Sequence, residues 1–278
     1  MNGATRLKLR ESIPSWLQED LGSGDLTTRL VISGAVAGRA EIVAKAAGIV
    51  AGVEVAQEIF GYLGRIEFNP DLGEGAEVFP GSRIAALSGS LAAILAGERL
   101  ALNLLQHLSG IATLTRSYVR EVAGTQARIL DTRKTTPGLR FLEKEAVRAG
   151  GGFNHRFGLY DGVLLKDNHL RAAGGVQPAL ELARAAPYGQ RVEIEVTTLA
   201  ELAEALAFGA EWIMLDNMDL AGIRAAVELT AGRAKLEASG GMSLDRVRAV
   251  AECGVDFISV GALTHSAPAL DISLEVLS

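Results

Sequence analysis

The chain has very little cysteine and few aromatic residues. It contains one cysteine among 278 residues, Cys253, and aromatic residues make up 5% of the chain. A single cysteine excludes an intramolecular disulfide framework and a zinc site built from cysteines. Because Cys253 lies between an amphipathic pattern and an apolar run, we expect a packed thiol and not a nucleophile.

Long hydrophobic runs and an excess of basic residues are also absent. The first twenty residues hold no apolar core of signal-peptide length, and apolar runs such as residues 91–96 are far shorter than the ~20 residues that span a bilayer. The formal net charge is -6, from 27 Lys and Arg against 33 Asp and Glu, whereas a nucleic-acid binder carries a basic excess over a domain or a face. We therefore predict a cytoplasmic protein that neither enters a membrane nor binds nucleic acid.

What the chain does have is a regular alternation of short apolar runs and amphipathic segments, from about residue 127 onward. Polar residues end these runs at positions 195, 216, 239 and 261, at intervals of 21, 23 and 22 residues. Each interval fits one strand, one helix and two short loops. This repeat predicts an α/β barrel with its site at the carboxyl ends of the strands. The alternative, an open doubly wound sheet, is disfavoured because no G-x-G-x-x-G follows the first strand.

The first 110 residues lack this repeat. Their alternating apolar patterns and Gly-Pro turns predict a separate α+β domain with a partly antiparallel sheet. The long apolar stripe of residues 91–124 predicts one or two helices. We therefore place an N-terminal domain at residues 1–110 and the barrel domain at residues 111–267.

A group of positive residues lies between Asp131 and His169, around the glycines at 150–152. It contains Arg133, Lys134, Arg140, Lys144, Arg148, His155, Arg156 and Lys166. In an acidic protein this group predicts a small anionic ligand, because Arg grips carboxylates in bidentate fashion and Lys offers a point charge to phosphate. The three glycines are equally typical of a hinge.

The residues at the strand ends are expected to meet at one mouth of the barrel: Lys134, Lys166, Glu195, Asp216, Ser239 and Gly261. Because an unpaired buried charge is unfavourable, Glu195 in VEIEV is expected to line a polar cavity, with a structural ion pair as the alternative. The loops at 239–241 and 260–262 offer backbone N–H groups suited to phosphate, although each alone is also typical of a tight turn. His107 and His265 are expected to be structural or to support the residues that contact the ligand, and His169 is compatible with either role.

The sequence resembles the quinolinate phosphoribosyltransferases, of the type II phosphoribosyltransferase family, over essentially its full length. The segments that carry the resemblance are EDLGSGDLTTR, GERLALNLLQHLSGIAT, DTRKTTPGLRFLEKEAVRAGGGFNHRFGLYDGVLLKDNH, EIEV, IMLDNM, EASGG and ISVGALTHSAPALDISL. The resemblance implies an N-terminal open-sandwich domain, an incomplete α/β barrel, a tail at 268–278 that returns to the first domain, and a homodimer with its sites at the subunit interface.

The resemblance also implies a reaction and the residues that perform it. Quinolinate and 5-phosphoribosyl-1-pyrophosphate (PRPP) would give nicotinate mononucleotide, pyrophosphate and carbon dioxide, with magnesium, in de novo NAD synthesis. The residues implied for quinolinate are Arg133, His155, Arg156 and Lys166, with Arg99 reaching across from the partner subunit. Those implied for PRPP are Lys134, Glu195, Asp216, Ser239, Gly240, Gly241, Gly261 and Ala262. Lys134, Glu195 and Asp216 would be catalytic, and the two carboxylates would hold magnesium directly or indirectly.

Two other functions stay open at this point. One is a phosphoribosyltransferase of the same fold that uses another base, such as nicotinate without decarboxylation. The full set of cations argues against it, because a monoacid needs fewer positive partners. The other is a barrel that binds a phosphorylated metabolite without catalysis, against which the presence of Lys134, Glu195 and Asp216 argues.

Overall fold

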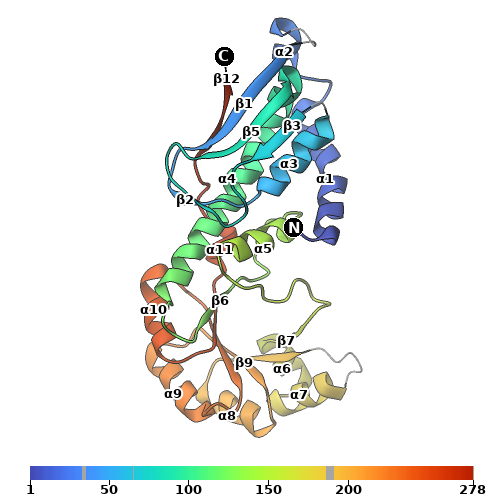
Figure 1. The fold of residues 1–278 in the computed structure, drawn as a ribbon. Coiled ribbons are helices and arrows are strands. Elements are labelled where there is room, and N and C mark those ends of the chain that lie inside the picture. The colour runs from blue at the N-terminus through green and yellow to red at the C-terminus, as the bar shows by residue number, and fades with distance from the viewer. Residues whose placement is uncertain (33–35, 65, 186–190, 278) are drawn as a thin grey trace. The chain divides into compact units, whose positions relative to one another are not determined.

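The chain folds into two compact units (Figure 1). The computed structural model describes residues 1–32, 36–64, 66–185 and 191–277. The first unit comprises residues 1–116, 141–151 and the chain from 267 onward; the second comprises residues 117–140 and 152–266. The segment 141–151 thus belongs to the first unit, although the repeat in the sequence had placed it in the barrel. The segment packs closely against residues of the first unit, since a Cβ at Gly150 would lie 2.5 Å from the carbonyl oxygen of Ala112.

The first unit is built on a four-stranded antiparallel sheet in the order β12-β1-β5-β3. Its strands are β1 (Ala37–Ala44), β3 (Ile66–Pro70), β5 (Arg83–Ser90) and β12 (Ile272–Leu277), and the short β2 (Gly48–Ile49) and β4 (Glu77–Val78) pair separately. Its helices are α1 (Gly3–Leu21), α2 (Leu26–Val31), α3 (Val53–Leu63), most of α4 (Leu91–Glu121) and most of α5 (Arg140–Ala149). Because β12 pairs with β1, the C-terminal tail lies in this unit.

Helices α1 and α3 supply much of the core of the first unit. Leu9, Ile13 and Leu17 of α1 are buried, and their spacing of four residues places them on one helix face. On α3, Phe60 is fully buried, and its ring stacks on that of Phe68 in β3 at 5.9 Å between centroids. Apolar residues at helical spacing thus bury one face of each helix.

The second unit is a parallel sheet of six strands covered by helices. Its strands are β6 (Arg128–Leu130), β7 (Val163–Leu165), β8 (Val192–Val196), β9 (Trp212–Asp216), β10 (Lys235–Ser239) and β11 (Phe257–Ser259). The helices are α6 (Asp167–Ala173), α7 (Val176–Ala185), α8 (Leu199–Ala207), α9 (Leu220–Thr230), α10 (Leu244–Glu252) and α11 (Ala262–His265).

The strand order β6-β11-β10-β9-β8-β7 decides between the two predicted architectures. Strands β7 to β11 are neighbours in chain order, and the first strand, β6, lies beside the last one. A doubly wound sheet would instead reverse its order at a crossover. Within the described ranges no ladder joins β6 to β7, so the barrel is incomplete. The predicted incomplete α/β barrel with an N-terminal α+β domain is confirmed.

Helix starts in the barrel unit follow closely on the polar strand ends. Thr198 and Glu201 form a capping box at the start of α8, and the side chain of Asp219 accepts the N–H of Gly222 at the start of α9. Such caps satisfy backbone donors that a helix leaves unpaired. The loops between strand and helix are also short, since α8 begins three residues after β8 ends and α9 begins four residues after β9 ends. Short, capped loops hold the side chains at the strand ends in place. No helix in the described part of the chain is long and apolar enough to cross a membrane.

Candidate active site

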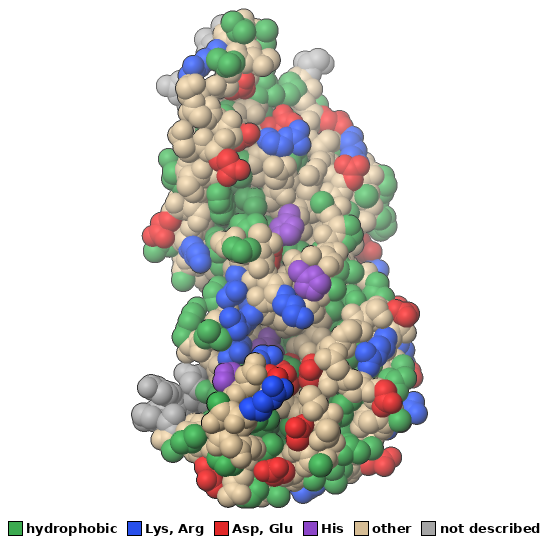
Figure 2. Space-filling model, turned by 180° about the vertical axis from the view of Figure 1, so that it is seen from behind, with side chains coloured by type: hydrophobic (Ala, Val, Ile, Leu, Met, Phe, Trp, Pro, Cys, Tyr) green, Lys and Arg blue, Asp and Glu red, His purple; other side chains and the backbone are tan. Residues whose placement is uncertain are grey.

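A cavity of about 760 Å³ opens at the carboxyl ends of the barrel strands. All residues that line it belong to the barrel unit. Figure 2 shows Lys and Arg side chains gathered beside Asp, Glu and His side chains on one face of the molecule. The lining includes the following predicted site residues: Arg133, Lys134, His155, Arg156, Lys166, Glu195, Asp216, Ser239, Gly240, Gly241, Gly261 and Ala262.

Two sets of polar residues can be distinguished along the strands. The mouth set consists of Glu195, Asp216, Ser239 and Gly261, which lie at or just beyond the strand ends and line the cavity. The deep set consists of Glu193, Glu237 and Ser259, each two positions earlier on its strand. Because side chains along a strand alternate between faces, residues two positions apart share a face. The deep set therefore lies on the same inner face, further from the mouth.

In the mouth set, Glu195 forms an ion pair with a cation. Lys166 Nζ lies 2.7 Å from Glu195 Oε2, and the Lys166 side chain is exposed. An exposed ion pair contributes only about 0–1 kcal/mol, so a ligand can displace either partner at little cost. The backbone N–H of Lys166 donates to Nδ1 of His169 at 2.9 Å, which forms the start of α6. His169 therefore has a structural role at this helix start.

A close approach between two loops fixes the position of Asp216. Asn217 Nδ2 donates to Asp216 Oδ2 at 2.8 Å. At Gly240, where φ is +91°, a Cβ would lie 2.1 Å from Oδ1 of Asn217. Only glycine fits there, both for space and for the left-handed backbone. Ser239-Gly240-Gly241 is therefore a built part of the cavity wall beside Asp216.

Among the described residues, one cation of the cavity has a buried donor without a partner. Nε of Arg133 is buried, and no described residue accepts a hydrogen bond from it. Arg156 Nη1 donates to the carbonyl of Gly162 at 2.8 Å. Burial, followed by the positive charge of Arg133, lowers the pKa of the Arg156 guanidinium from its ordinary value. An anion bound between these two groups would satisfy the free donor and offset their repulsion.

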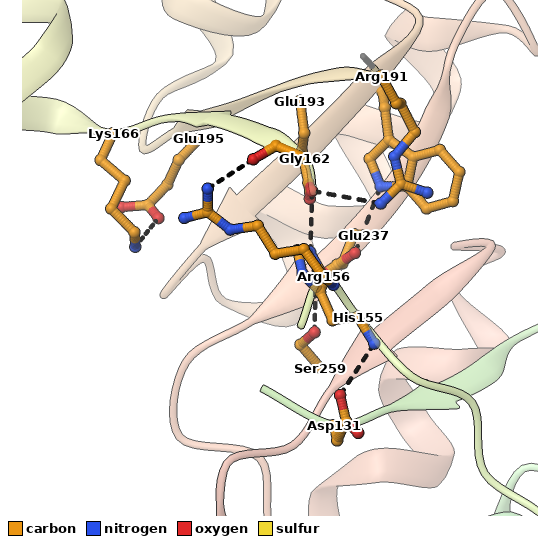
Figure 3. Close-up of polar contacts among 11 residues, drawn as sticks. Asp131, His155, Arg156, Gly162, Lys166, Arg191, Glu193, Glu195, Glu237 and Ser259 are labelled. Carbon is orange, nitrogen blue, oxygen red and sulfur yellow. Dashed lines mark hydrogen bonds and ion pairs between the residues drawn. The ribbon is translucent and has the colours of Figure 1, made fainter. Parts of the chain in front are cut away.

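The deep set surrounds the ring of His155 (Figure 3). His155 Nε2 lies 2.9 Å from Glu193 Oε2 and 3.7 Å from Glu237 Oε1. Glu237 Oε1 lies 2.5 Å from the hydroxyl of Ser259, and its other oxygen accepts the indole N–H of Trp212 at 3.3 Å. The side chains of His155, Glu193 and Glu237 are only 6%, 1% and 0% exposed. The deep set and His155 thus form a largely buried polar cluster inside the barrel, and Ser259 and His155 also line the cavity.

Two opposing influences act on the protonation of His155. Burial lowers its pKa, but the hydrogen bond to Glu193 and the charges of Glu237 and Glu193 outweigh burial, so the pKa lies above its ordinary value. The backbone N–H of Arg156, however, points at His155 Nδ1 at 2.8 Å, which requires a lone pair on that atom. This direct contact favours the neutral ring with its proton on Nε2, donated to Glu193.

Glu237 is the most strongly perturbed carboxyl group of the cluster. Burial, followed by the negative charge of Glu193, raises the pKa of Glu237 to about 7. The guanidinium of Arg191 lies over the ring of Trp212, 3.7 Å from the ring centroid. Its Nη2 lies 3.9 Å from Glu193 Oε2. The cluster therefore combines two carboxyl groups with one nearby arginine.

Asp131, at the end of β6, anchors the segment that carries His155 and Arg156. Its carboxylate accepts the backbone N–H of His155 at 2.9 Å and the side-chain amide of Asn154 at 2.6 Å. Asp131 is fully buried. Charge-assisted hydrogen bonds of this kind hold a loop firmly. The segment is therefore fixed from both sides, by Asp131 and by the deep set.

Our sequence reasoning missed Asp131, Glu193 and Glu237 as parts of the site. A signal was present, because Glu193 lies within VEIEV and Glu237 within KLEAS, both otherwise apolar strands. The argument that favoured a polar surrounding for Glu195 applies equally to these two residues. His265, expected to be structural or to support the residues that contact the ligand, lines the cavity, and its Nδ1 lies 2.6 Å from the hydroxyl of Ser266.

Some of the predicted residues lie in the first unit instead. Arg99 is on α4 with its side chain 62% exposed, and Nη2 lies 3.9 Å from Glu98. Lys144 and Arg148 are on the part of α5 that belongs to the first unit, where Lys144 is buried and Arg148 is exposed. His107 lies there too, 2.9 Å from Glu143. The positive residues between Asp131 and His169 are therefore divided between the two units.

The carboxylates expected to hold magnesium are suited to that ion. Glu195 and Asp216 both line the cavity, and each has one oxygen outside its contact with Lys166 or Asn217. Carboxylate oxygens are the ligands that Mg²⁺ prefers, usually one or two together with substrate phosphates and water. A second group, His155, Glu193 and Glu237, has ligand atoms within 4.8 Å of one another. These atoms contact one another and Ser259, so the mouth set fits magnesium better.

Comparisons with known proteins agree with this geometry. The family model "Quinolinate phosphoribosyl transferase, N-terminal domain" matches residues 25–109, and the C-terminal domain model of the same family matches residues 111–275. The chain is 47% identical over 272 residues to a "Probable nicotinate-nucleotide pyrophosphorylase [carboxylating]" of Bacillus subtilis, with 97% of this chain and 94% of that protein covered.

Two further comparisons extend this result. The chain is 42% identical over 276 residues to the "Nicotinate-nucleotide pyrophosphorylase [carboxylating]" of Mycobacterium leprae, with 96% of each chain covered. The crystal structure of NadC from Streptococcus pyogenes superposes with a TM-score of 0.94 at 41% identity and covers 98% of both chains. Both domain models and these full-length relatives match, and the chain therefore belongs to the quinolinate phosphoribosyl transferase family.

Proposed function

We propose that this protein transfers the 5-phosphoribosyl group of PRPP to quinolinate with loss of carbon dioxide, giving nicotinate mononucleotide and pyrophosphate. Such a reaction serves de novo NAD synthesis. The observation that carries the proposal is one cavity that combines Arg133, Arg156 and Lys166 with the carboxylates Glu195 and Asp216. Family membership supports the same reaction, as does the name of the relative from Nicotiana glauca, "Quinolinate phosphoribosyltransferase [decarboxylating] 1", at 40% identity.

In this proposal the cations bind the two carboxylates of quinolinate. Arg133 offers a buried Nε without a partner among the described residues. Arg156 lies close enough for the charge of Arg133 to lower its pKa. Lys166 can leave Glu195 and turn to a carboxylate, since their ion pair is exposed. His155 supports the site because its Nδ1 accepts the backbone N–H of Arg156. Arginine pairs are suited to a rigid diacid because each guanidinium binds a carboxylate in a fixed fork.

The other half of the cavity would bind PRPP. The loops with Ser239, Gly240, Gly241, Gly261 and Ala262 would hold the 5-phosphate through backbone N–H groups, which lack obstructing side chains at the glycines. Lys134 would stabilise the negative charge that develops on the leaving pyrophosphate. Glu195 and Asp216 would hold Mg²⁺, directly or through water, and that ion would neutralise the leaving pyrophosphate when bound.

The chemistry then needs placement more than a nucleophilic side chain. As the bond to pyrophosphate breaks, positive charge develops on the ribose, and the carboxylates of Glu195 and Asp216, which both line the cavity, would stabilise it. The ring nitrogen of quinolinate forms the new bond to C1 of the ribose and becomes cationic. Its positive charge then stabilises the electron pair left on the neighbouring ring carbon as the carboxylate leaves as carbon dioxide, and a proton from water bonds to that carbon in its place. Holding the diacid and excluding water is the main task of the protein.

An assay of the purified protein tests this function directly. Quinolinate, PRPP and magnesium are supplied, and nicotinate mononucleotide and carbon dioxide are measured together, with nicotinate as a parallel substrate. We expect both products from quinolinate and none from nicotinate. Turnover of nicotinate alone would move the protein to a relative that uses another base, and binding without turnover would favour a phosphometabolite sensor.

We further propose a cytoplasmic homodimer in which Arg99 completes the quinolinate site of the partner subunit. Arg99 is exposed and has no described partner closer than Glu98 at 3.9 Å, as expected for a residue available to another molecule. Arg99→Ala and Lys134→Ala proteins should each be nearly inactive. When they are mixed to give heterodimers, one site of each dimer regains both residues, so part of the activity should return. Verified heterodimers that stay inactive would place Arg99 outside the partner's site.

A further inference from the structure

The deep set creates an electrostatic problem for the proposed diacid site. Glu193 and Glu237 are buried, and their ligand atoms and Nε2 of His155 lie within 4.8 Å of one another. His155 itself lines the cavity. Two ionised carboxylates so close together in a buried site repel each other. They would also repel a dianion bound beside His155 and Arg156. A proton on one of the two carboxyl groups would remove this repulsion.

The hydrogen bonds show which carboxyl group is suited to carry a proton. Glu193 Oε2 receives the Nε2 proton of His155, because Nδ1 of that ring already accepts the N–H of Arg156. Glu193 is therefore used as an acceptor. Glu237 instead faces the hydroxyl of Ser259, which can accept as well as donate. A protonated Glu237 would donate to Ser259 with one oxygen and accept from Trp212 with the other, so both of its oxygens would be satisfied.

The groups around Glu237 come from several elements of the barrel. The charged and titratable ones are His155 from the segment before β7, Glu193 from β8 and, beyond Glu193, Arg191 at the start of that strand. Trp212 and Ser259 face it as neutral groups from β9 and β11. The positive charge of Arg191 is turned toward Glu193 and Trp212. It therefore compensates Glu193, and in the described part of the chain no Lys or Arg side chain pairs with Glu237.

We propose that Glu237 is a positioning residue of the diacid site, which in its protonated form keeps a second negative charge out of the deep set and thereby sets the affinity for quinolinate. It acts through His155 on the adjacent Arg156. The identity of the diacid rests on the proposed function. The raised pKa of Glu237, which burial and the charge of Glu193 bring to about 7, agrees with this role.

The test compares the wild type with Glu237→Gln over a range of pH. Glutamine imitates the protonated acid, since its oxygen can accept from Trp212 and its amide can donate to Ser259. In the wild type, the KM for quinolinate should rise by about 10-fold between about pH 6 and about pH 8.5, because a second buried charge appears near the diacid. In Glu237→Gln this KM should stay flat, and the KM for PRPP should change little in either protein. An unchanged pH profile in Glu237→Gln would overturn the proposal.

Two further variants keep the test decisive. Glu74→Gln is a matched control, because burial also raises the pKa of Glu74, which lies in the first unit and accepts N–H groups of Gly52 and Glu54. It should keep the wild-type pH profile. Ser259→Ala serves if Glu237→Gln fails to fold. Removal of the Ser259 hydroxyl takes away a hydrogen-bond partner of Glu237, so the pH at which the KM rises should shift, and an unmoved rise would contradict the proposal.

Binding of benzene-1,2-dicarboxylate, followed by calorimetry, separates this inference from the proposed function. That diacid carries the same pair of carboxylates but has no ring nitrogen to ribosylate. If the wild type binds it more weakly at high pH and Glu237→Gln does not, the inference holds even where quinolinate is not turned over. Turnover of quinolinate with a KM that is flat with pH in the wild type would overturn the inference and leave the proposed function standing.

Discussion

The mouth set and the deep set come from the same strands but differ in what their polar groups contact. Glu195 and Asp216 line the cavity, and their ion pair or hydrogen bond leaves oxygens free for a ligand. Glu193 and Glu237 contact His155, Ser259 and Trp212 of the protein itself, and Glu193 also lies near Arg191. Two positions along a strand thus separate residues suited to bind ligands from residues suited to hold the site in place. Changes in the mouth set should therefore affect activity, and changes in the deep set should affect stability as well.

The largest effect is expected at the mouth. Glu195→Gln should lower kcat by about 100-fold or more, because it removes a charge aimed at the transition state. Its free energy of unfolding should change by about 1 kcal/mol at most, since Lys166, the partner of Glu195, is exposed. Steady-state kinetics and denaturant unfolding measure the two effects. Glu252→Gln, which breaks the exposed pair with Arg248 on α10, is the control and should change neither. A large loss of stability in Glu195→Gln would remove the distinction between the two sets.

A change in the deep set should reduce both quantities. Glu193→Leu leaves the Nε2 proton of buried His155 without its acceptor, which costs about 1–3 kcal/mol. Urea unfolding should show that loss, and the KM for quinolinate should rise because the His155–Arg156 segment loses one of its two supports. Full stability with lost activity would instead make Glu193 a member of the ligand-binding set.

The pH dependence of stability sharpens the comparison further. The pKa of Glu237 is raised to about 7 in the folded protein, so between the ordinary value and about 7 the folded state holds a proton that the unfolded chain lacks. The stability from Glu237 is fully present at pH values below that ordinary value and is lost as pH rises through about 7. Relative to Glu237→Gln, the wild type should lose up to about 1.4 kcal/mol per pH unit in this window. Parallel unfolding curves for the two proteins from acid to neutral pH would contradict the raised value.

The smallest effect is expected at the rim of the deep set. Arg191→Met removes a cation that lies 3.7 Å from the ring centroid of Trp212 but keeps an unbranched side chain over it. Since Arg191 is exposed, the loss should be about 0.5–1 kcal/mol in unfolding free energy, with an unchanged KM for quinolinate. A raised or lowered KM would show that the charge of Arg191 affects quinolinate binding in the cavity. Arg191 would then belong to the deep set.

Much of the barrel and of the mouth set could be predicted from the sequence. The polar residues at 195, 216, 239 and 261 recur at the spacing of one strand and one helix. Since parallel strands bring their carboxyl ends to one edge, regular spacing alone predicts that these residues meet. The cavity contains all of them. The division of the positive residues was not predictable in this way, because Lys144 and Arg148 lie on a helix whose burial partners are distant in the chain.

The sequence by itself therefore determined which residues stand at the strand ends, what chemistry they offer and to which family the chain is similar. Only the tertiary structure decided that Glu193, Glu237 and Ser259 surround His155. The contacts within this cluster join residues 22 to 82 positions apart, from three strands and the segment before β7. Local periodicity shows which face of a strand a residue occupies. Partners across the barrel depend on strand order and register, which are set by the packing of the whole sheet.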